Sequence, residues 1–116
     1  MSPSKSEKEA REATEHLVEL VHLQKRRFQL VAKDQGFTPQ QAATISNLAP
    51  GETLPMSALA DILMCDASNV TGIVDKLEAR GLVRREQGED RRVKVIRLTP
   101  EGEALRAAMR ELLLEP

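Results

Sequence analysis

The chain has 116 residues, of which 41% are hydrophobic and 30% are charged, and its formal net charge is −1 at pH 7. This length allows one small domain, and the near-neutral charge excludes a chain that binds polyanions over its whole surface. Phe28 and Phe37 are the only aromatic residues, so the core must be aliphatic. The polar N-terminal stretch has no apolar run typical of a signal peptide or a bilayer span, and one cysteine cannot form an intrachain disulfide, so we expect a cytoplasmic protein.

A long helix is predicted over residues 6–35, because apolar residues recur at helical spacing and Gly36 follows as a stop signal. One side of this helix carries Leu17, Leu20, Val21, Phe28 and Val31. A second helix is predicted to begin at the capping box 38–41, Thr-Pro-Gln-Gln, with proline at the first helical position, and to end before Pro50.

A helix-turn-helix is predicted next. Residues 57–64 read as a short helix, and only Cys65 and the N-cap residue Asp66 separate it from a helix that runs from Ala67 to about Arg80. A connection this short makes two helices cross steeply. The second helix buries a stripe formed by Val70, Ile73, Val74 and Leu77.

The opposite face of this second helix carries short, hydrogen-bonding or basic side chains, which suit close approach to base edges in the major groove of DNA. The candidate DNA contacts on it are Ala67, Ser68, Asn69, Thr71, Gly72 and Lys76. Asp75 lies on the same face and would repel phosphate unless it were paired. We therefore expect Asp75 to hold an arginine.

A β-hairpin is predicted from the strand-like runs 82–86 and 93–98, with Gly88 as the turn former between them. Arg91 and Arg92 then lie at its tip, where they suit the minor groove, because a narrow groove concentrates negative potential.

The strands of the hairpin add Arg84 and Lys94 as further candidate DNA contacts. Residues 67–97 contain eight Lys or Arg against five Asp or Glu, whereas residues 36–66 contain three acids and no base. The chain therefore has a locally basic part that can contact phosphates.

A last helix is predicted to begin at the cap Thr99-Pro100-Glu101 and to cover residues 99–114. It has an apolar stripe formed by Leu105, Ala108, Met109, Leu112 and Leu113. Burial of this stripe requires the first helix, a partner subunit or both.

Several short motifs occur in one order, and their combination is more specific than any one of them: Leu59-Ala60, Val70-Thr71, Val74-Asp75-Lys76-Leu77-Glu78, Gly81-Leu82-Val83-Arg84-Arg85, Asp90-Arg91-Arg92 and Leu98-Thr99-Pro100-Glu101-Gly102. From Thr38 to about Leu113 the sequence resembles the MarR family of bacterial and archaeal winged-helix transcription regulators. The resemblance implies a mainly α fold with a small β-hairpin (α+β), in one domain over residues 1–116. A winged helix-turn-helix at 38–98 would be flanked by dimerisation helices at 6–35 and 99–114.

The resemblance also implies a function. The resemblance implies a homodimer that binds a pseudo-palindromic double-stranded DNA operator, usually as a repressor. Such a homodimer often releases the operator when a small ligand or an oxidant binds or reacts with the protein. The resemblance places base and phosphate contacts on Ser68, Asn69, Thr71 and Lys76, minor-groove contacts on Arg91 and Arg92, and bracing roles on Asp75 and Asp90. Family members usually continue with one more C-terminal helix, whereas this sequence stops at Pro116, so we name no effector.

Two other classes of function stay open at this stage. One is a winged helix that docks a protein instead of DNA, although the small polar face and the tip arginines argue against it. The other is thiol chemistry at Cys65, as an oxidant sensor or an enzyme, although the helix-turn-helix turn usually holds a packing residue. We expect no enzyme, metal or cofactor, because the sequence has no glycine-rich phosphate loop, metal-ligand cluster or nucleophile-base pair, and His16 and His22 lie on different sides of one helix.

Overall fold

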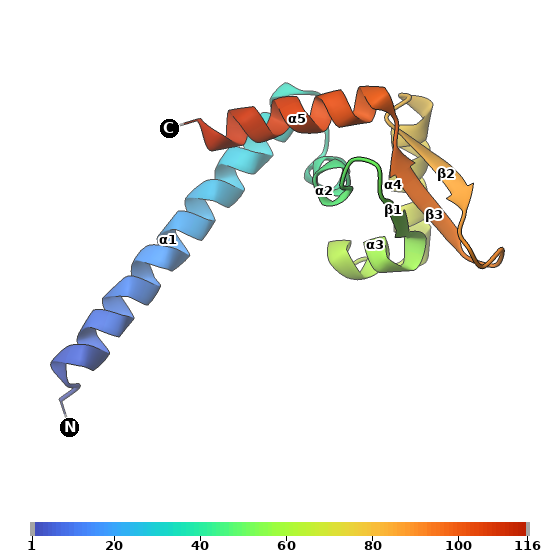
Figure 1. Cartoon of the computed structure of the whole chain (residues 1–116). Coiled ribbons are helices and arrows are strands. Elements are labelled where there is room, and N and C mark those ends of the chain that lie inside the picture. The colour runs from blue at the N-terminus through green and yellow to red at the C-terminus, as the bar shows by residue number, and fades with distance from the viewer. Residues whose placement is uncertain (1, 116) are drawn as a thin grey trace.

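The computed structural model describes residues 2–115, and Met1 and Pro116 lie outside the described residues. Five helices and three strands in this part of the chain confirm the mainly α fold with a small antiparallel sheet (Figure 1). Helix α1 projects away from the body of the molecule, whose extents are 59 × 31 × 24 Å. In chain order the elements are α1 (Lys5–Asp34), α2 (Pro39–Asn47), β1 (Thr53–Pro55), α3 (Met56–Leu63), α4 (Ala67–Ala79), β2 (Val83–Gln87), β3 (Lys94–Leu98) and α5 (Pro100–Leu114).

The starts of α2, α4 and α5 follow the capping residues expected from the sequence. Thr38 Oγ1 accepts a hydrogen bond from the N–H of Gln41 at 3.1 Å, and Gln41 Oε1 accepts one from the N–H of Thr38 at 3.1 Å, which confirms the capping box of α2. Asp66 and Thr99 accept equivalent bonds from the N–H three residues on, at 2.9 and 3.1 Å. These side chains fix where α4 and α5 begin.

Helices α3 and α4 form the helix-turn-helix, and the chain bends by 106° between them. The first of these helices ends one residue earlier than predicted, at Leu63. Met64 is its C-cap and adopts φ 54° and ψ 44°, the left-handed conformation that glycine favours, because the chain must change direction at this point.

Among residues 2–115 no single helix is long and apolar enough to cross a membrane, and α3 and α4 reach that length and composition only together, across the bend between them.

The sheet has the strand order β1-β3-β2 with both pairings antiparallel. The predicted hairpin is β2 and β3, in which Val83 pairs with Leu98 and Gln87 with Lys94. The edge strand β1 was not predicted, because three residues are too few to show alternation and Pro55 argues against a strand.

Gly88 lies close to β3 and outside the tight turn itself, which corrects its predicted role. Its N–H donates to Val93 O at 2.8 Å, and a Cβ on Gly88 would lie 3.2 Å from Val95 Cγ1 and 3.3 Å from Val93 O. The tight turn lies beyond it, closed by the hydrogen bond from the N–H of Val93 to Asp90 O at 2.9 Å.

The core lies between α2, α3, α4, the sheet and α5. The predicted stripe of α4 is buried, and the largest fully buried apolar side chains come from six different elements and one loop: Ile45, Leu48, Leu59, Val70, Val74, Leu77, Val83, Ile96 and Met109. Phe28 and Val31 of α1 and Leu105 of α5 pack against this cluster from outside. The winged unit therefore has one aliphatic core, closed on one side by the terminal helices.

Helix α5 is held against the winged unit by its first turn. A Cβ on Gly102 would lie 2.0 Å from Leu82 O, so only glycine lets the helix come this close to that backbone. The same carbonyl accepts a hydrogen bond from the N–H of Thr99 at 3.1 Å. The position of α5 is therefore fixed at its start.

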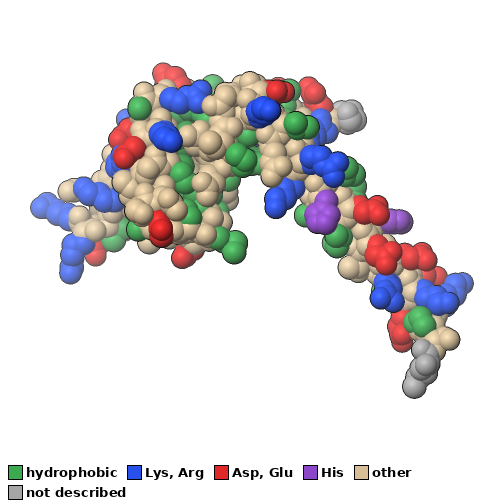
Figure 2. All heavy atoms as spheres, turned by 180° about the vertical axis from the view of Figure 1, so that it is seen from behind, with side chains coloured by type: hydrophobic (Ala, Val, Ile, Leu, Met, Phe, Trp, Pro, Cys, Tyr) green, Lys and Arg blue, Asp and Glu red, His purple; other side chains and the backbone are tan. Residues whose placement is uncertain are grey.

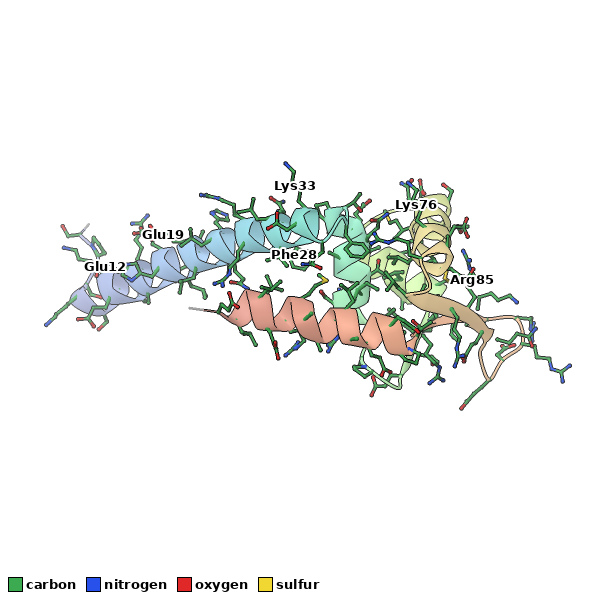
Figure 3. The ribbon with its side chains drawn as sticks, turned by 90° about the horizontal axis from the view of Figure 1, so that it is seen from above. Glu12, Glu19, Phe28, Lys33, Lys76 and Arg85 are labelled. Atoms are coloured by element: carbon green, nitrogen blue, oxygen red, sulfur yellow. The ribbon has the colours of Figure 1, made fainter. Side chains whose placement is uncertain are left out.

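The apolar side predicted for α1 is covered only near its C-terminal end. Helix α5 crosses α1 there, and Arg27 Nη2 donates to Leu112 O at 2.8 Å. Farther toward the N-terminus α1 carries exposed apolar side chains, which are Leu17, Val18, Leu20, Val21 and Leu23. Figure 3 shows that the part of α1 with Glu12 and Glu19 extends beyond the other elements.

Candidate nucleic-acid interface

The face of α4 that points away from the core is exposed along its length. We call it the reading face, and its residues are Ala67, Ser68, Asn69, Thr71, Gly72, Asp75 and Lys76. On one side a hollow of about 250 Å³ separates it from the start of α2, at Thr38 and Gln41. On the other side a hollow of about 530 Å³ lies between Thr71, the hairpin and Met56. The helix therefore stands out between two hollows.

Two hydroxyl groups on this face are already engaged as donors. Ser68 Oγ donates to Asp66 Oδ1 at 2.8 Å, and Thr71 Oγ1 donates to Ala67 O at 3.0 Å. Both oxygens still have lone pairs that can accept a hydrogen bond. Among residues 2–115 the side chains of Asn69 and Lys76 make no hydrogen bond or ion pair, so they are the polar groups of the face that are free to bind a partner.

Asp66 fixes the N-terminal end of this face. The backbone N–H of Asn69 and the hydroxyl of Ser68 hydrogen-bond its carboxylate and hold the pKa of Asp66 below its usual value. The N-cap carboxylate is therefore charged at neutral pH. Its negative charge interacts favourably with the positive end of the helix dipole.

Arg85 of β2 clamps the reading face to the hairpin. Its Nη1 donates to Glu78 Oε1 at 2.7 Å, its Nη2 donates to Asp75 Oδ1 and to Thr71 O, and its backbone N–H donates to Glu78 Oε2 at 3.1 Å. Figure 3 shows Arg85 on the hairpin close to α4, which carries Lys76. The expectation that Asp75 holds an arginine is therefore met by Arg85, a residue that was not among the predicted site residues.

The same contacts raise the pKa of Arg85. Partial burial of the Arg85 guanidinium lowers its pKa, but hydrogen bonds and charges from Asp75 and Glu78 outweigh this and raise the pKa of Arg85 above its ordinary value. The guanidinium is therefore permanently charged, and it compensates carboxylates that would otherwise repel a phosphate backbone.

The hairpin tip exposes its arginines. The side chain of Arg92 is 93% exposed, and Asp90 Oδ1 lies 3.6 Å from its Nε and accepts a hydrogen bond from its backbone N–H at 3.0 Å. Arg91 beside it is also exposed. Figure 2 shows basic side chains gathered at this tip, where they project from the body. Asp90 is therefore placed to restrain Arg92 at the tip.

The two predicted contacts on the hairpin strands differ in their surroundings. Arg84 Nε donates to Glu86 Oε1 at 3.1 Å, and Arg97 Nε donates to the same oxygen at 3.2 Å, so Arg84 belongs to an ion-pair network on the outer side of the sheet. Lys94 is exposed and forms no ion pair in the described part of the chain. Lys94 is therefore the freer of the two charges.

Cys65 lies in the bend between α3 and α4, half-buried and packed against the core. This environment agrees with a packing role and gives no support to thiol chemistry. His16 and His22 are exposed on α1, and no group of three His, Cys, Asp or Glu in residues 2–115 is placed to hold a metal ion.

Sequence reasoning missed the start of α2 as a border of the candidate interface. Thr38, Gln40 and Gln41 line the hollow that Ser68, Asn69 and Lys76 line from the other side. The capping box located the start of α2 but gave no sign that it lies beside α4, because that proximity depends on how the helices cross. Arg85 could have been found from the period-2 alternation of its strand, which puts it on the same side as the buried Val83.

A bent pair of helices followed by a basic antiparallel hairpin defines a winged helix-turn-helix protein. The sequence profile of the MarR family matches residues 35–93, about half of the chain, and this protein belongs to the MarR family of winged-helix regulators. Comparison with curated protein sequences gave no match.

Solved structures of transcription regulators have the same fold. Regulator Tm0710 from Thermotoga maritima is 27% identical, with a TM-score of 0.78 over 89% of this chain and 73% of that one. NadR in complex with 4-hydroxyphenylacetate is 30% identical, with a TM-score of 0.74 over 84% of this chain and 70% of that one. The MepR–DNA complex from S. aureus is 24% identical, with a TM-score of 0.67 over 84% of this chain and 82% of that one, and at this identity the likeness shows the fold alone.

Proposed function

We propose that this protein is a cytoplasmic transcription regulator that binds a pseudo-palindromic double-stranded DNA operator as a homodimer and represses transcription. The observation that carries the proposal is the reading face of α4, which is exposed, made of small polar side chains and flanked by hollows of about 250 and 530 Å³. A helix that enters the major groove needs such clearance on both sides.

Each part of the interface has a role in this proposal. The free amide of Asn69 pairs with an adenine, Ala67 and Thr71 offer methyl groups to thymine, and Ser68 accepts from a base or backbone donor. Lys76, Lys94 and Arg84 contact phosphates, while Arg91 and Arg92 enter the adjacent minor groove. Gly72 leaves room for base edges. Asp75 and Asp90 support the arginines that they contact.

The homodimer is supported by the surface of α1. Its exposed leucines lie on a helix that leaves the winged unit, and a soluble monomer rarely leaves such a row of large apolar groups in water: Leu17, Leu20, Leu23 and Leu30. A two-fold pairing through α1 and α5 would cover them. It would also present two reading faces to half-sites with centres roughly 34 to 36 Å apart.

Release of DNA by a small ligand is the remaining part of the proposal. A groove of about 470 Å³ lies where α1, α2 and α3 meet, and its lining includes Phe28, Ile62 and Leu63 as well as the polar side chains of Lys25 and Gln29. A ligand in this groove would touch both α1 and the winged unit. It could therefore change how the two reading faces are spaced.

The test is selection from a random duplex library with the purified protein at two salt concentrations, together with the molar mass in solution. Enrichment of a palindrome by a dimer supports the proposal, and a folded monomer that enriches nothing contradicts it. Arg92→Ala should weaken binding to all sequences and lower the salt slope, whereas Asn69→Ala should cost on the order of 1 to 3 kcal/mol at one base position. Lys8→Ala, on the far end of α1, is the control that should change neither.

A further inference from the structure

Asp75 occupies the centre of the reading face, not its edge. At about 100° per residue, Ser68, Gly72 and Asp75 lie within about 60° of one another on α4, opposite the buried stripe. The Asp75 side chain is 60% exposed. A helix that docks with this face toward the floor of a groove brings the carboxylate to the base edges.

The clamp uses only part of this carboxylate. Among residues 2–115, Asp75 accepts a side-chain hydrogen bond only from Arg85, and only through Oδ1. That bond compensates the negative charge and fixes the rotation of the side chain. The second oxygen, Oδ2, keeps its lone pairs for a donor outside the protein.

Gly72 clears the space beside it. Glycine in a helix interior is unfavourable relative to alanine, and it has to be explained by a close neighbour or by a special backbone conformation. Gly72 has neither in the described structure, because no atom outside its chain neighbours and the adjoining helix backbone lies within 4 Å of the place of a Cβ, and its φ is not positive. The open space is explained if a surface outside the chain fills it when the protein acts.

We infer that Asp75 is a base-reading residue, whose Oδ2 accepts a hydrogen bond from the exocyclic amino group of a cytosine in the major groove. The inference rests on the proposed function. A carboxylate only accepts, and the major-groove donors are the amino groups of cytosine and adenine. In the major groove the amino group of adenine lies between two acceptors, its own N7 and O4 of the paired thymine, which both repel a carboxylate, whereas the amino group of cytosine has an acceptor on one side only, O6 of the paired guanine. The charge of Asp75 therefore selects cytosine.

The test compares the operators selected by the wild-type protein and by Asp75→Asn. An asparagine pairs with both N6 and N7 of adenine, so one position in each half-site should change from cytosine to adenine, with a discrimination of about ten-fold. Glu78→Gln is the matched control, since it removes the same charge and another partner of Arg85 but leaves Asp75 in place. It should keep cytosine at that position.

A second measurement uses the wild-type protein and needs no mutation. N4-methylcytosine still pairs with guanine but carries a methyl group where the groove-facing hydrogen was. One such substitution at the position read by Asp75 should weaken binding by about ten-fold. The same substitution outside the selected operator should have no effect.

The outcomes separate the inference from the proposed function. If the wild-type protein selects no operator, the proposed function fails and the inference with it. If it selects one, but Asp75→Asn keeps the cytosine and no methylated cytosine weakens binding, Asp75 only braces Arg85 and the inference alone is overturned. An identical change of preference in Glu78→Gln would also overturn it, because the effect would then come from the release of Arg85.

Discussion

Replacing Gly72 with alanine should make the protein more stable and a weaker DNA binder. The backbone at Gly72 is helical, and a Cβ there meets nothing within 4 Å, so the substitution carries no steric cost in the free protein. A glycine-to-alanine change in a helix interior stabilises by about 0.5 to 1 kcal/mol. For a domain of this length, that gain corresponds to a rise in melting temperature of about 2 to 4 °C.

The same methyl group should obstruct DNA. It lies on the centre line of the reading face, beside Ser68 and Asp75, and close-packed contacts do not absorb an added methyl without moving one surface away. We expect affinity for the selected operator to fall by about ten-fold, which is about 1.4 kcal/mol. The assays are thermal unfolding followed by circular dichroism and fluorescence anisotropy with a labelled duplex.

The opposite signs of the two effects make the reasoning easy to refute. A loss of stability in Gly72→Ala would show that the space beside Gly72 is needed by the fold. Increased stability with unchanged operator affinity would show that α4 does not approach DNA through this face. Ser57→Ala, at an exposed position on α3 outside the reading face, is a suitable control for both assays.

Three further predictions concern the rest of the fold. Gly102→Ala should lower the free energy of unfolding by at least about 2 kcal/mol, because the Cβ of the alanine would lie 2.0 Å from Leu82 O. Urea denaturation measures this loss. A change below about 0.5 kcal/mol would contradict the close approach of α5 to Leu82. Met64→Gly should raise the melting temperature by about 2 °C, because glycine relieves the backbone strain of the left-handed conformation and the 91% exposed Met64 side chain loses no packing. This gain should exceed the stability that is lost because glycine gives the unfolded chain more conformational freedom. A lower melting temperature would refute this. Arg80→Ala should lower the free energy of unfolding by about 1 kcal/mol, because the Arg80 guanidinium lies 3.9 Å from the centre of the Phe37 ring and donates to a backbone carbonyl. Urea denaturation measures this loss, and Arg80→Lys should recover only part of the lost stability. Equal stability of all three proteins would show that the contacts of Arg80 contribute nothing.

The sequence predicted the elements whose ends are marked by local chemistry. Thr38, Asp66 and Thr99 cap their helices through their own side chains, so the information lies within four residues of each helix start. Strand β1 has no such local signal, since its pairing with β3 is specified by residues about 40 positions away. Local signals also placed the exposed side of α4 correctly, because its buried stripe is long and periodic.

The candidate site was predicted residue by residue but not as an arrangement. The sequence suggested that Asp75 needs an arginine and offered several, and only the packing of β2 beside α4 selects Arg85. The same packing explains why Arg84, the neighbouring residue, faces a different partner, since successive side chains of a strand point to opposite sides of the sheet. Which charge stays free for DNA is therefore decided by tertiary structure.

Besides its buried stripe, α4 has polar contacts at its start, its side and its end. Asp66 fixes its start, Arg85 fixes its side against the hairpin, and Arg80 fixes its end by stacking on Phe37 and donating to Gly36 O at 3.1 Å. Gly36 and Phe37 form the connection between α1 and α2, so the end of α4 touches the point where α1 leaves the winged unit. A change in the angle of α1 would therefore act at a point that contacts the end of α4. In a dimer paired through α1, such a change would alter the spacing between two reading faces, while the order of side chains on each face would stay the same.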